Sequence, residues 1–186
     1  MSNIVVFASG RGTNFQAIVD ACKVGLLKAK ITALFTDNAD AEVVRKAKAV
    51  NIPVILIDPN NEAEIVVNLM TCSPDMIILA GYLKKIPPLV IDNYDQIINI
   101  HPSLLPKYGG KGMYGKAVHQ AVLDNNEDET GVTIHKVTQD YDEGEIIEQL
   151  RISVHENDTA ESLSSRILKY EQILLVHTIK RLIENG

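Results

Sequence analysis

Short apolar runs alternate with helix-like segments over the first two thirds of the chain. In the segment after the first run, Phe15, Ile18 and Cys22 have the spacing of one helix face. Apolar strands that alternate with helices are typical of βαβ units, in which helices cover both faces of a parallel sheet. The runs that predict strands are Asn3–Ser9, Ile31–Asn38, Pro53–Pro59, Asp75–Tyr82 and Gln96–Ile100.

The last third of the chain has a different pattern. Gly131–Val154 has two strand-like halves without a helix between them, which predicts a hairpin at the edge of the sheet. The last segment predicts a long helix that Asp158 or Thr159 can cap, with Lys180 and Arg181 in its last turn. The whole pattern predicts an α/β fold: a Rossmann-like, doubly wound and mostly parallel sheet with an antiparallel hairpin at one edge and a long C-terminal helix.

Length and composition fit a single globular domain over residues 1–186. Hydrophobic residues make up 46% of the chain and charged residues 23%, which argues against disorder. The formal net charge of −6 argues against a nucleic-acid partner held by a broad basic face, but it permits one small anion site.

The sequence also bears on the compartment. The first residues lack the basic start of a signal peptide, and no stretch reaches the ~18 apolar residues of a membrane span. Cys22 and Cys72 lie outside any CxxC spacing, so neither a zinc site nor a disulfide framework is indicated. We therefore expect a cytoplasmic protein with free cysteines and no membrane partner.

The stretch ASGRGTN, residues 8–14, joins the first predicted strand to the first predicted helix. Ligands of open α/β sheets bind at such strand ends, and the N–H groups of Gly12, Thr13 and Asn14 would open the helix and favour an anion, most naturally a phosphate. The spacing matches neither GxGxxG nor the P-loop, which favours a phosphomonoester over NAD or ATP. The alternative is an ordinary turn in which Thr13-Asn14 forms the helix cap.

Asn99 and His101 stand two apart at the end of a predicted strand, so their side chains point to the same face. An amide N–H and a charged imidazole that donate to one atom would stabilise an oxyanion. Because the chain has no GxSxG motif and both cysteines fall in helical patterns, the attacking group of an acyl transfer would belong to the substrate. The alternative is a satisfied core asparagine followed by a histidine in a surface turn.

The turn of the predicted hairpin carries DYDEG, residues 140–144. Asp and Gly are ordinary turn residues. The functional interpretation is that Asp142 approaches His101 and raises the pKa of its imidazole, which could then stabilise an oxyanion and pass a proton. The other histidines are interpreted mostly as surface or packing residues: His119, His135, His155 and His177. The interpretation of His135 is the least certain of these.

Four motifs cover essentially the whole chain: NIVVFASGRGTNFQAI, DMIILAGYLKKI, NIHPSLLPKYGGKGMYG and GVTIHKVTQDYDEG. Together they resemble the glycinamide ribonucleotide formyltransferases, also known as phosphoribosylglycinamide formyltransferases, in the order and intervals of that family. The combination of NIHPSLLP with a later YDEG is specific to folate-dependent formyltransferases.

The resemblance implies transfer of a formyl group from 10-formyltetrahydrofolate to the amine of glycinamide ribonucleotide in purine biosynthesis, without a metal. It also implies one formyltransferase domain, monomeric or homodimeric, with a phosphate-binding N-terminal half and a folate-binding C-terminal half. The implied site residues are Asn99, His101 and Asp142 for catalysis, Gly12, Thr13, Asn14 and Glu171 for the ribonucleotide, and Leu83, Lys84, Ile86 and Tyr141 for the folate.

The chain departs from the family pattern at three places. Leu83-Lys84 stands where the family often has an Arg or a Met-Arg pair, and Leu168 stands where relatives place a polar or basic residue near the phosphate. The loop YGGKGMYG replaces a histidine-containing loop of some relatives, and Lys107 or Lys111 in this region is a candidate substrate contact.

Other functions fit the sequence less well. A methionyl-tRNA formyltransferase would need a second, basic domain, and a formyltetrahydrofolate hydrolase usually carries an added N-terminal domain. A non-catalytic nucleotide-binding domain explains the first loop but leaves Asn99, His101 and Asp142 without a role. A dehydrogenase is disfavoured because no acidic residue is clearly placed after a GxGxxG turn.

Overall fold

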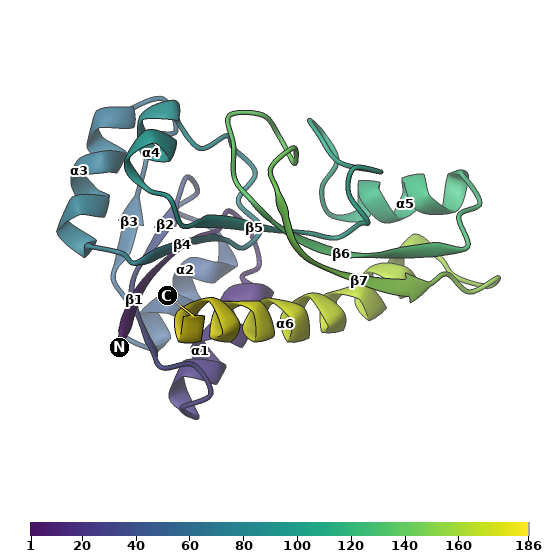
Figure 1. Ribbon diagram of the computed structural model, residues 1–186, viewed down its shortest axis with the longest axis horizontal. Coiled ribbons are helices and arrows are strands. Elements are labelled where there is room, and N and C mark those ends of the chain that lie inside the picture. Colours follow the sequence, from purple (N-terminus) through teal and green to yellow (C-terminus); the bar gives the residue numbers. More distant parts are fainter. Residues whose placement is uncertain (186) are drawn as a thin grey trace.

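A computed structural model describes residues 1–185, which form one seven-stranded sheet and six helices (Figure 1). The strands are β1 (Ser2–Phe7), β2 (Ala29–Thr36), β3 (Val54–Leu56), β4 (Met76–Leu79), β5 (Ile97–His101), β6 (Glu129–Lys136) and β7 (Ile146–Ser153). The helices are α1 (Thr13–Lys23), α2 (Glu42–Ala49), α3 (Glu62–Cys72), α4 (Pro88–Asn93), α5 (Lys116–Asp124) and α6 (Ala160–Asn185).

The strand order β3-β2-β1-β4-β5-β6-β7 confirms the predicted doubly wound sheet. The first five strands pair in parallel, whereas β6 is antiparallel to β5 and β7 is antiparallel to β6. The chain moves from β1 outward to β2 and β3, then returns to β4 on the other side of β1. This reversal creates a crevice at the carboxyl ends of β1 and β4, where open α/β sheets bind their ligands.

Both faces of the sheet are buried, as the continuous apolar strands predict. Ile4 and Val6 of β1 face a core that is covered by α1, α2 and α6. Val5 and Phe7 face a second core that is covered by α3 and α4. The long helix α6 lies along the sheet and reaches from the β6–β7 hairpin to the N-terminal strands (Figure 1). None of the helices within residues 1–185 has the length and apolar composition that crossing a membrane requires.

Several boundaries differ from the sequence-based expectation. Strand β3 covers three residues rather than the whole apolar run, because only these pair with β2. Helix α5 lies between the loop after β5 and β6 and was not among the predicted elements. In α6, Oγ1 of Thr159 accepts a hydrogen bond from Ser162 N at 3.1 Å, as a cap does. Lys180 and Arg181 lie before the last turn rather than in it, because α6 continues to Asn185.

Candidate active site

A cavity of about 600 Å³ opens at the carboxyl ends of β1, β4 and β5. Its walls come from the loops after these three strands, from the β6–β7 loop, and from one face each of α5 and α6. The sequence-predicted site residues all line it: Gly12, Thr13, Asn14, Leu83, Lys84, Ile86, Asn99, His101, Tyr141, Asp142 and Glu171. The fold therefore gathers into one cavity residues that the sequence scatters over most of its length.

Asn99 and His101 lie at the end of β5, where the sheet changes from parallel to antiparallel pairing. Asn99 is paired with His135 of β6, and His101 is paired with Thr133. The side chains of Asn99 and His101 both line the cavity, as their spacing of two on a strand predicts. His101 is only 4% exposed, so its imidazole is held by the protein rather than by solvent.

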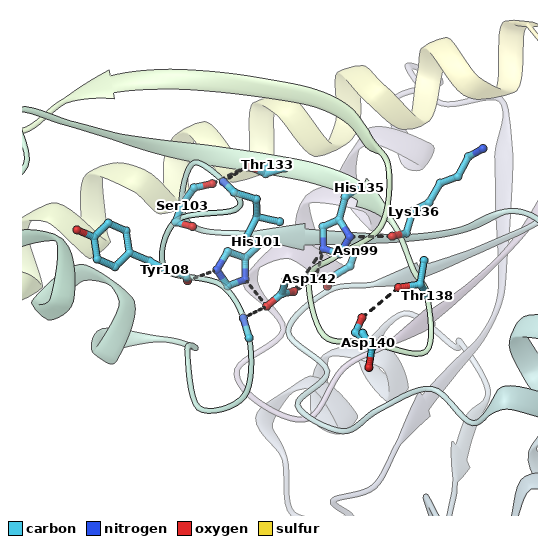
Figure 2. A network of polar contacts seen from close by, with 12 residues as sticks. Asn99, His101, Ser103, Tyr108, Thr133, His135, Lys136, Thr138, Asp140 and Asp142 are labelled. Carbon is cyan, nitrogen blue, oxygen red and sulfur yellow. Dashed lines mark hydrogen bonds and ion pairs between the residues drawn. The ribbon is translucent and has the colours of Figure 1, made fainter.

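The two ring nitrogens of His101 have different neighbours (Figure 2). Nε2 lies 2.8 Å from the carbonyl oxygen of Tyr108, and Nδ1 lies 3.5 Å from Oδ2 of Asp142. Because a carbonyl oxygen only accepts, Nε2 carries a hydrogen and donates it. Nδ1 is left facing the carboxylate.

Asp142 is the centre of the polar network in Figure 2. Its Oδ2 accepts a hydrogen bond from Gly110 N at 2.9 Å, and its Oδ1 accepts one from Nδ2 of Asn99 at 3.3 Å. Nε2 of His135 lies 3.4 Å from the same Oδ1. Burial by itself would raise the pKa of Asp142, but the contacts with His135, His101 and Gly110 outweigh burial and hold that pKa below its ordinary value. The group is a carboxylate at neutral pH.

The expected rise in the pKa of His101 was wrong. Asp142 does approach the ring, but burial has the larger effect and lowers the pKa of His101 below its ordinary value of 6.5. Asp142 and the Tyr108 carbonyl oppose this fall, while His135 adds to it. His101 is therefore neutral at neutral pH when the cavity holds no substrate, because a buried imidazole loses more hydration on charging than one carboxylate restores.

His135, the least certain of the histidines interpreted as surface or packing residues, belongs to the same network. Its Nδ1 lies 2.8 Å from the carbonyl oxygen of Lys136 and donates to it; Nε2 then accepts in the neutral ring and donates to Asp142 in the protonated ring. Nδ2 of Asn99 lies 3.0 Å from that Nε2. The Asn99 amide is therefore oriented by His135 on one side and by Asp142 on the other.

The other end of the cavity is formed by the loop before α1. Gly12 is the residue before the helix and has a φ of 67°, a left-handed conformation that glycine adopts at little cost. A Cβ at Gly12 would also overlap the side chain of Val43. No side chain within residues 1–185 caps α1, so the capping alternative for Thr13-Asn14 is wrong and the first N–H groups of the helix remain available to an anion.

Asn14 connects this loop to α6. Its Nδ2 donates to Oε2 of Glu171 at 2.7 Å, whereas its Oδ1 is buried and meets no donor from the described chain. Burial raises the pKa of Glu171, although the Asn14 hydrogen bond and the positive charge of Arg11 both act to lower it. Arg11 is exposed and also lines the cavity.

The profile of a protein family described as "Formyl transferase" matches residues 2–179. This chain belongs to that family. The chloroplastic phosphoribosylglycinamide formyltransferase of Vigna unguiculata is 40% identical over 189 residues, which cover 97% of this chain and 61% of the relative. The phosphoribosylglycinamide formyltransferase of Escherichia coli (strain K12) is 33% identical over 180 residues, which cover 92% of this chain and 82% of the relative.

A solved structure agrees with the family assignment. Phosphoribosylglycinamide formyltransferase from Bacillus halodurans superposes with a TM-score of 0.90 at 36% identity, covering 97% of this chain and 95% of that one. This formyl transferase family member spans 61% of the length of the chloroplastic relative of Vigna unguiculata and 65% of that of Arabidopsis thaliana.

In this family member, the loop after β4 forms a further wall of the cavity. Ile86 is buried and Leu83 is exposed, and Leu83 N donates to Oγ of Ser9 at 3.3 Å. Nζ of Lys85 lies 5.1 Å from the centre of the Tyr141 ring and 3.5 Å from Oδ1 of Asp140. Lys85, which the sequence did not single out, thus connects the β4 loop to the β6–β7 loop.

Two further residues of the cavity were also missed from the sequence. His119 of α5 is 2% exposed and Tyr82 of the β4 loop is 8% exposed. Nδ1 of His119 and the hydroxyl of Tyr82 have no hydrogen-bond partner among the residues that the structure describes. Their only sequence signal is a polar group inside an otherwise apolar pattern. Lys107, by contrast, does not face the cavity: its Nζ pairs with Oε1 of Glu127 at 2.8 Å.

No group of three or more His, Cys, Asp or Glu residues within residues 1–185 has the arrangement of a metal site.

Proposed function

We propose that this family member transfers the formyl group of 10-formyltetrahydrofolate to the amine of glycinamide ribonucleotide, a step of de novo purine biosynthesis. One observation carries the proposal: Asn99, His101 and Asp142 line the same cavity as the glycine-rich loop that opens α1. The relatives from Vigna unguiculata and Escherichia coli, both named phosphoribosylglycinamide formyltransferase, support it.

The ribonucleotide occupies the α1 end of the cavity. N–H groups of Gly12, Thr13 and Asn14 bind the phosphate, aided by the positive end of the α1 dipole. Glu171 binds the ribose hydroxyls, because a carboxylate accepts two hydrogen bonds from neighbouring O–H groups. Leu168, on the same face of α6, supplies no charge, so the phosphate depends on the α1 loop.

The folate occupies the end of the cavity between the β4 loop and the β6–β7 loop. The lining chemistry fits a pterin with an acidic tail: Leu83, Ile86 and Tyr141 offer apolar surface, and Lys84 offers a cation. When bound there, the folate supplies an electrophilic formyl carbon on its N10.

Asn99 and His101 stabilise the negative charge that develops on the formyl oxygen as the amine attacks the formyl carbon. His101 carries a hydrogen on Nε2, and Asn99 carries two on Nδ2. Each residue donates one of these hydrogens to the formyl oxygen and gives up a hydrogen bond that it makes in the structure. His101 enters the reaction neutral, and its Nε2–H donates to the negative oxygen without a change in the charge of the ring.

Asp142 assists the movement of the proton. The amine loses one proton after its nitrogen bonds to the formyl carbon, and N10 of the folate gains one as its bond to that carbon breaks. Asp142 remains ionised because its pKa is lowered, and it lies between His101 and Asn99. It can therefore accept a proton from the amine side and return it to the leaving nitrogen. The residues form no covalent intermediate.

One domain contains both substrate sites in this proposal. The N-terminal half contributes the phosphate-binding loop, and the C-terminal half contributes Tyr141 and Asp142. We also propose that the protein acts in the cytoplasm, because Cys22 and Cys72 are both free thiols, as is usual in a reducing compartment.

The test is a formyl-transfer assay with purified protein and 10-formyltetrahydrofolate, in the presence and absence of glycinamide ribonucleotide. Release of tetrahydrofolate only with the ribonucleotide supports the proposal. Release at the same rate without it would indicate a hydrolase. Absence of release in folded protein would favour a nucleotide-binding domain without catalytic activity.

A further inference from the structure

Three buried histidines line the cavity, and one of them differs from the other two. His101 donates to Tyr108 and faces Asp142, while His135 donates to Lys136 and faces Asn99. These two rings are therefore engaged by the protein on both nitrogens (Figure 2).

His119 is as deeply buried as His135, at 2% exposure, yet its Nδ1 has no partner within residues 1–185. Buried imidazole nitrogens are nearly always hydrogen-bonded in folded proteins, because leaving one without a partner forfeits its hydration. A residue that served packing alone at this position would be better replaced by leucine or phenylalanine. The ring instead borders the cavity that Asn99, His101 and Asp142 also line.

His119 lies between the reacting centre, where His101 is its neighbour, and helix α6, which lines the ribonucleotide end of the cavity. Helix α5 packs against α6, and Nζ of Lys116 at the start of α5 pairs with Oε1 of Glu161 at 2.9 Å. The cavity-lining residues of α6 are Ser164, Leu168 and Glu171, which share one face of that helix. Glu171 in turn holds Asn14 of the phosphate-binding loop. The folate loops come from β4 and from the β6–β7 connection instead.

We propose that His119 is a ribonucleotide-binding residue, whose neutral imidazole hydrogen-bonds to an oxygen or N–H group of the bound ribonucleotide. The proposal rests on the proposed function and adds a contact from α5 to it. A neutral ring offers one N–H donor and one lone pair, so it suits a polar ligand without demanding a countercharge. It also gives polarity to a wall on which Leu168 has none.

The experiment measures the Kd of glycinamide ribonucleotide and of tetrahydrofolate by calorimetry for the wild type and four variants. His119→Leu removes both nitrogens, His119→Asn keeps a polar group near the Nδ1 position, and His119→Gln keeps one near the Nε2 position. Val122→Ala is the matched control, since Val122 is buried on the same helix but does not line the cavity. We expect His119→Leu to raise the ribonucleotide Kd about ten-fold, as loss of one ligand hydrogen bond does, and to leave the tetrahydrofolate Kd unchanged.

Rescue of ribonucleotide affinity by Asn or by Gln would support the proposal and identify the nitrogen that binds. An unchanged ribonucleotide Kd in His119→Leu, with a loss of thermal stability like that of Val122→Ala, would overturn it and leave His119 as a packing residue. A rise in the tetrahydrofolate Kd alone would also overturn it. Failure of the proposed function is a separate result, because wild-type protein would then bind no ribonucleotide at all.

Discussion

Oδ2 of Asp142 lies between the backbone N–H of Gly110, at 2.9 Å, and Nδ1 of His101, at 3.5 Å. The carboxylate thus ties the β6–β7 loop both to the end of β5 and to the loop that leads into α5. Asp142 has a φ of 59°, so the backbone itself is turned to direct this side chain inward. One residue therefore fixes the relative positions of three segments at the reacting centre.

Replacing Asp142 by asparagine keeps the shape of the side chain and removes its charge. We expect kcat to fall by roughly 10²- to 10⁴-fold, the usual contribution of a group that moves a proton. The ribonucleotide Kd should stay within about two-fold, because Asp142 lies away from the phosphate-binding loop. Single-turnover formyl transfer and calorimetry measure the two quantities.

Glu143→Gln is the matched control for this variant, since Glu143 is the exposed neighbour of Asp142 and does not line the cavity. It should leave kcat unchanged. An equal fall in both variants would show that the loss comes from the charge of the loop rather than from the carboxylate at the reacting centre.

His101→Ala removes an oxyanion donor. We expect kcat to fall by roughly 10²- to 10³-fold with little change in substrate binding, because the donor acts mainly on charge that develops in the transition state. The control is His177→Gln, whose side chain is 64% exposed on α6. A large rise in KM with normal kcat would contradict an oxyanion role, since it would mean that His101 binds the ground state.

Asn14→Ala tests the phosphate-binding end of the cavity. The variant loses the 2.7 Å hydrogen bond to Glu171 and leaves that buried carboxyl without its amide partner. We expect the ribonucleotide Kd to rise about ten-fold, which corresponds to a hydrogen bond to a charged group, while the tetrahydrofolate Kd is preserved. Gln16→Ala, which removes a hydrogen bond to Asp20 on the outer side of the same helix, should change neither constant. Equal loss of both affinities in Asn14→Ala would refute the division of the cavity into two substrate ends.

The pH dependence of stability follows from the buried imidazoles. Burial, and then the neighbouring His101, lowers the pKa of His119 to about 4, and burial also lowers the pKa of His101. In the unfolded chain both groups have a pKa near their ordinary value of 6.5. For His119, the unfolded chain therefore binds more protons between pH 6.5 and about 4, so the free energy of unfolding falls as the pH falls through this range, by up to about 1.4 kcal/mol per pH unit. His101 adds a decrease of the same sign below pH 6.5.

Above pH 7 the two imidazoles do not make the free energy of unfolding depend on pH, because they are neutral in both the folded and the unfolded state. At lower pH, Asp142 also decreases the free energy of unfolding as the pH falls, since its pKa is held below 3.8 in the folded protein. Urea denaturation of the wild type and of His119→Asn from pH 4 to 8 measures the effect. The variant should show a shallower decline below pH 6.5, and an identical decline would mean that His119 is protonated in the folded protein.

The sequence was sufficient for the order of the strands and for the residues that the structure brings together at the end of β5. Apolar runs determine which segments become parallel strands, and a spacing of two on a strand places Asn99 and His101 on one face whatever the rest of the chain does. This placement needs local geometry alone. Asp142 was singled out in the turn of the predicted hairpin, but a sequence pattern could not establish its approach to His101.

The missing parts depend on tertiary structure. His135 reaches Asn99 only through the β5–β6 register, which a sequence pattern does not determine. The pKa of His101 depends on how deeply its ring is buried, and the effect of burial exceeded that of Asp142. His119 lies on α5, a nine-residue helix whose short apolar pattern was too weak to predict it.

The contact between Asn99 and His135 supports a last prediction. Nε2 of His135 is 3.0 Å from Nδ2 of Asn99, so the ring orients the amide that we propose as an oxyanion donor. His135 is thus a positioning residue, and His135→Phe should lower kcat about ten-fold while KM for both substrates changes little. His135→Gln, which can return an acceptor near the Nε2 position, should recover part of the loss.

A double-mutant cycle on kcat separates positioning from packing. If His135 acts through Asn99, the variant Asn99→Ala with His135→Phe should be little slower than Asn99→Ala alone, because the amide to be oriented is already absent. Independent roles would instead multiply the two losses. The positioning role would be refuted if the losses multiplied and if glutamine did not restore activity in a variant of normal thermal stability. His135 would then act through its contact with Asp142 alone.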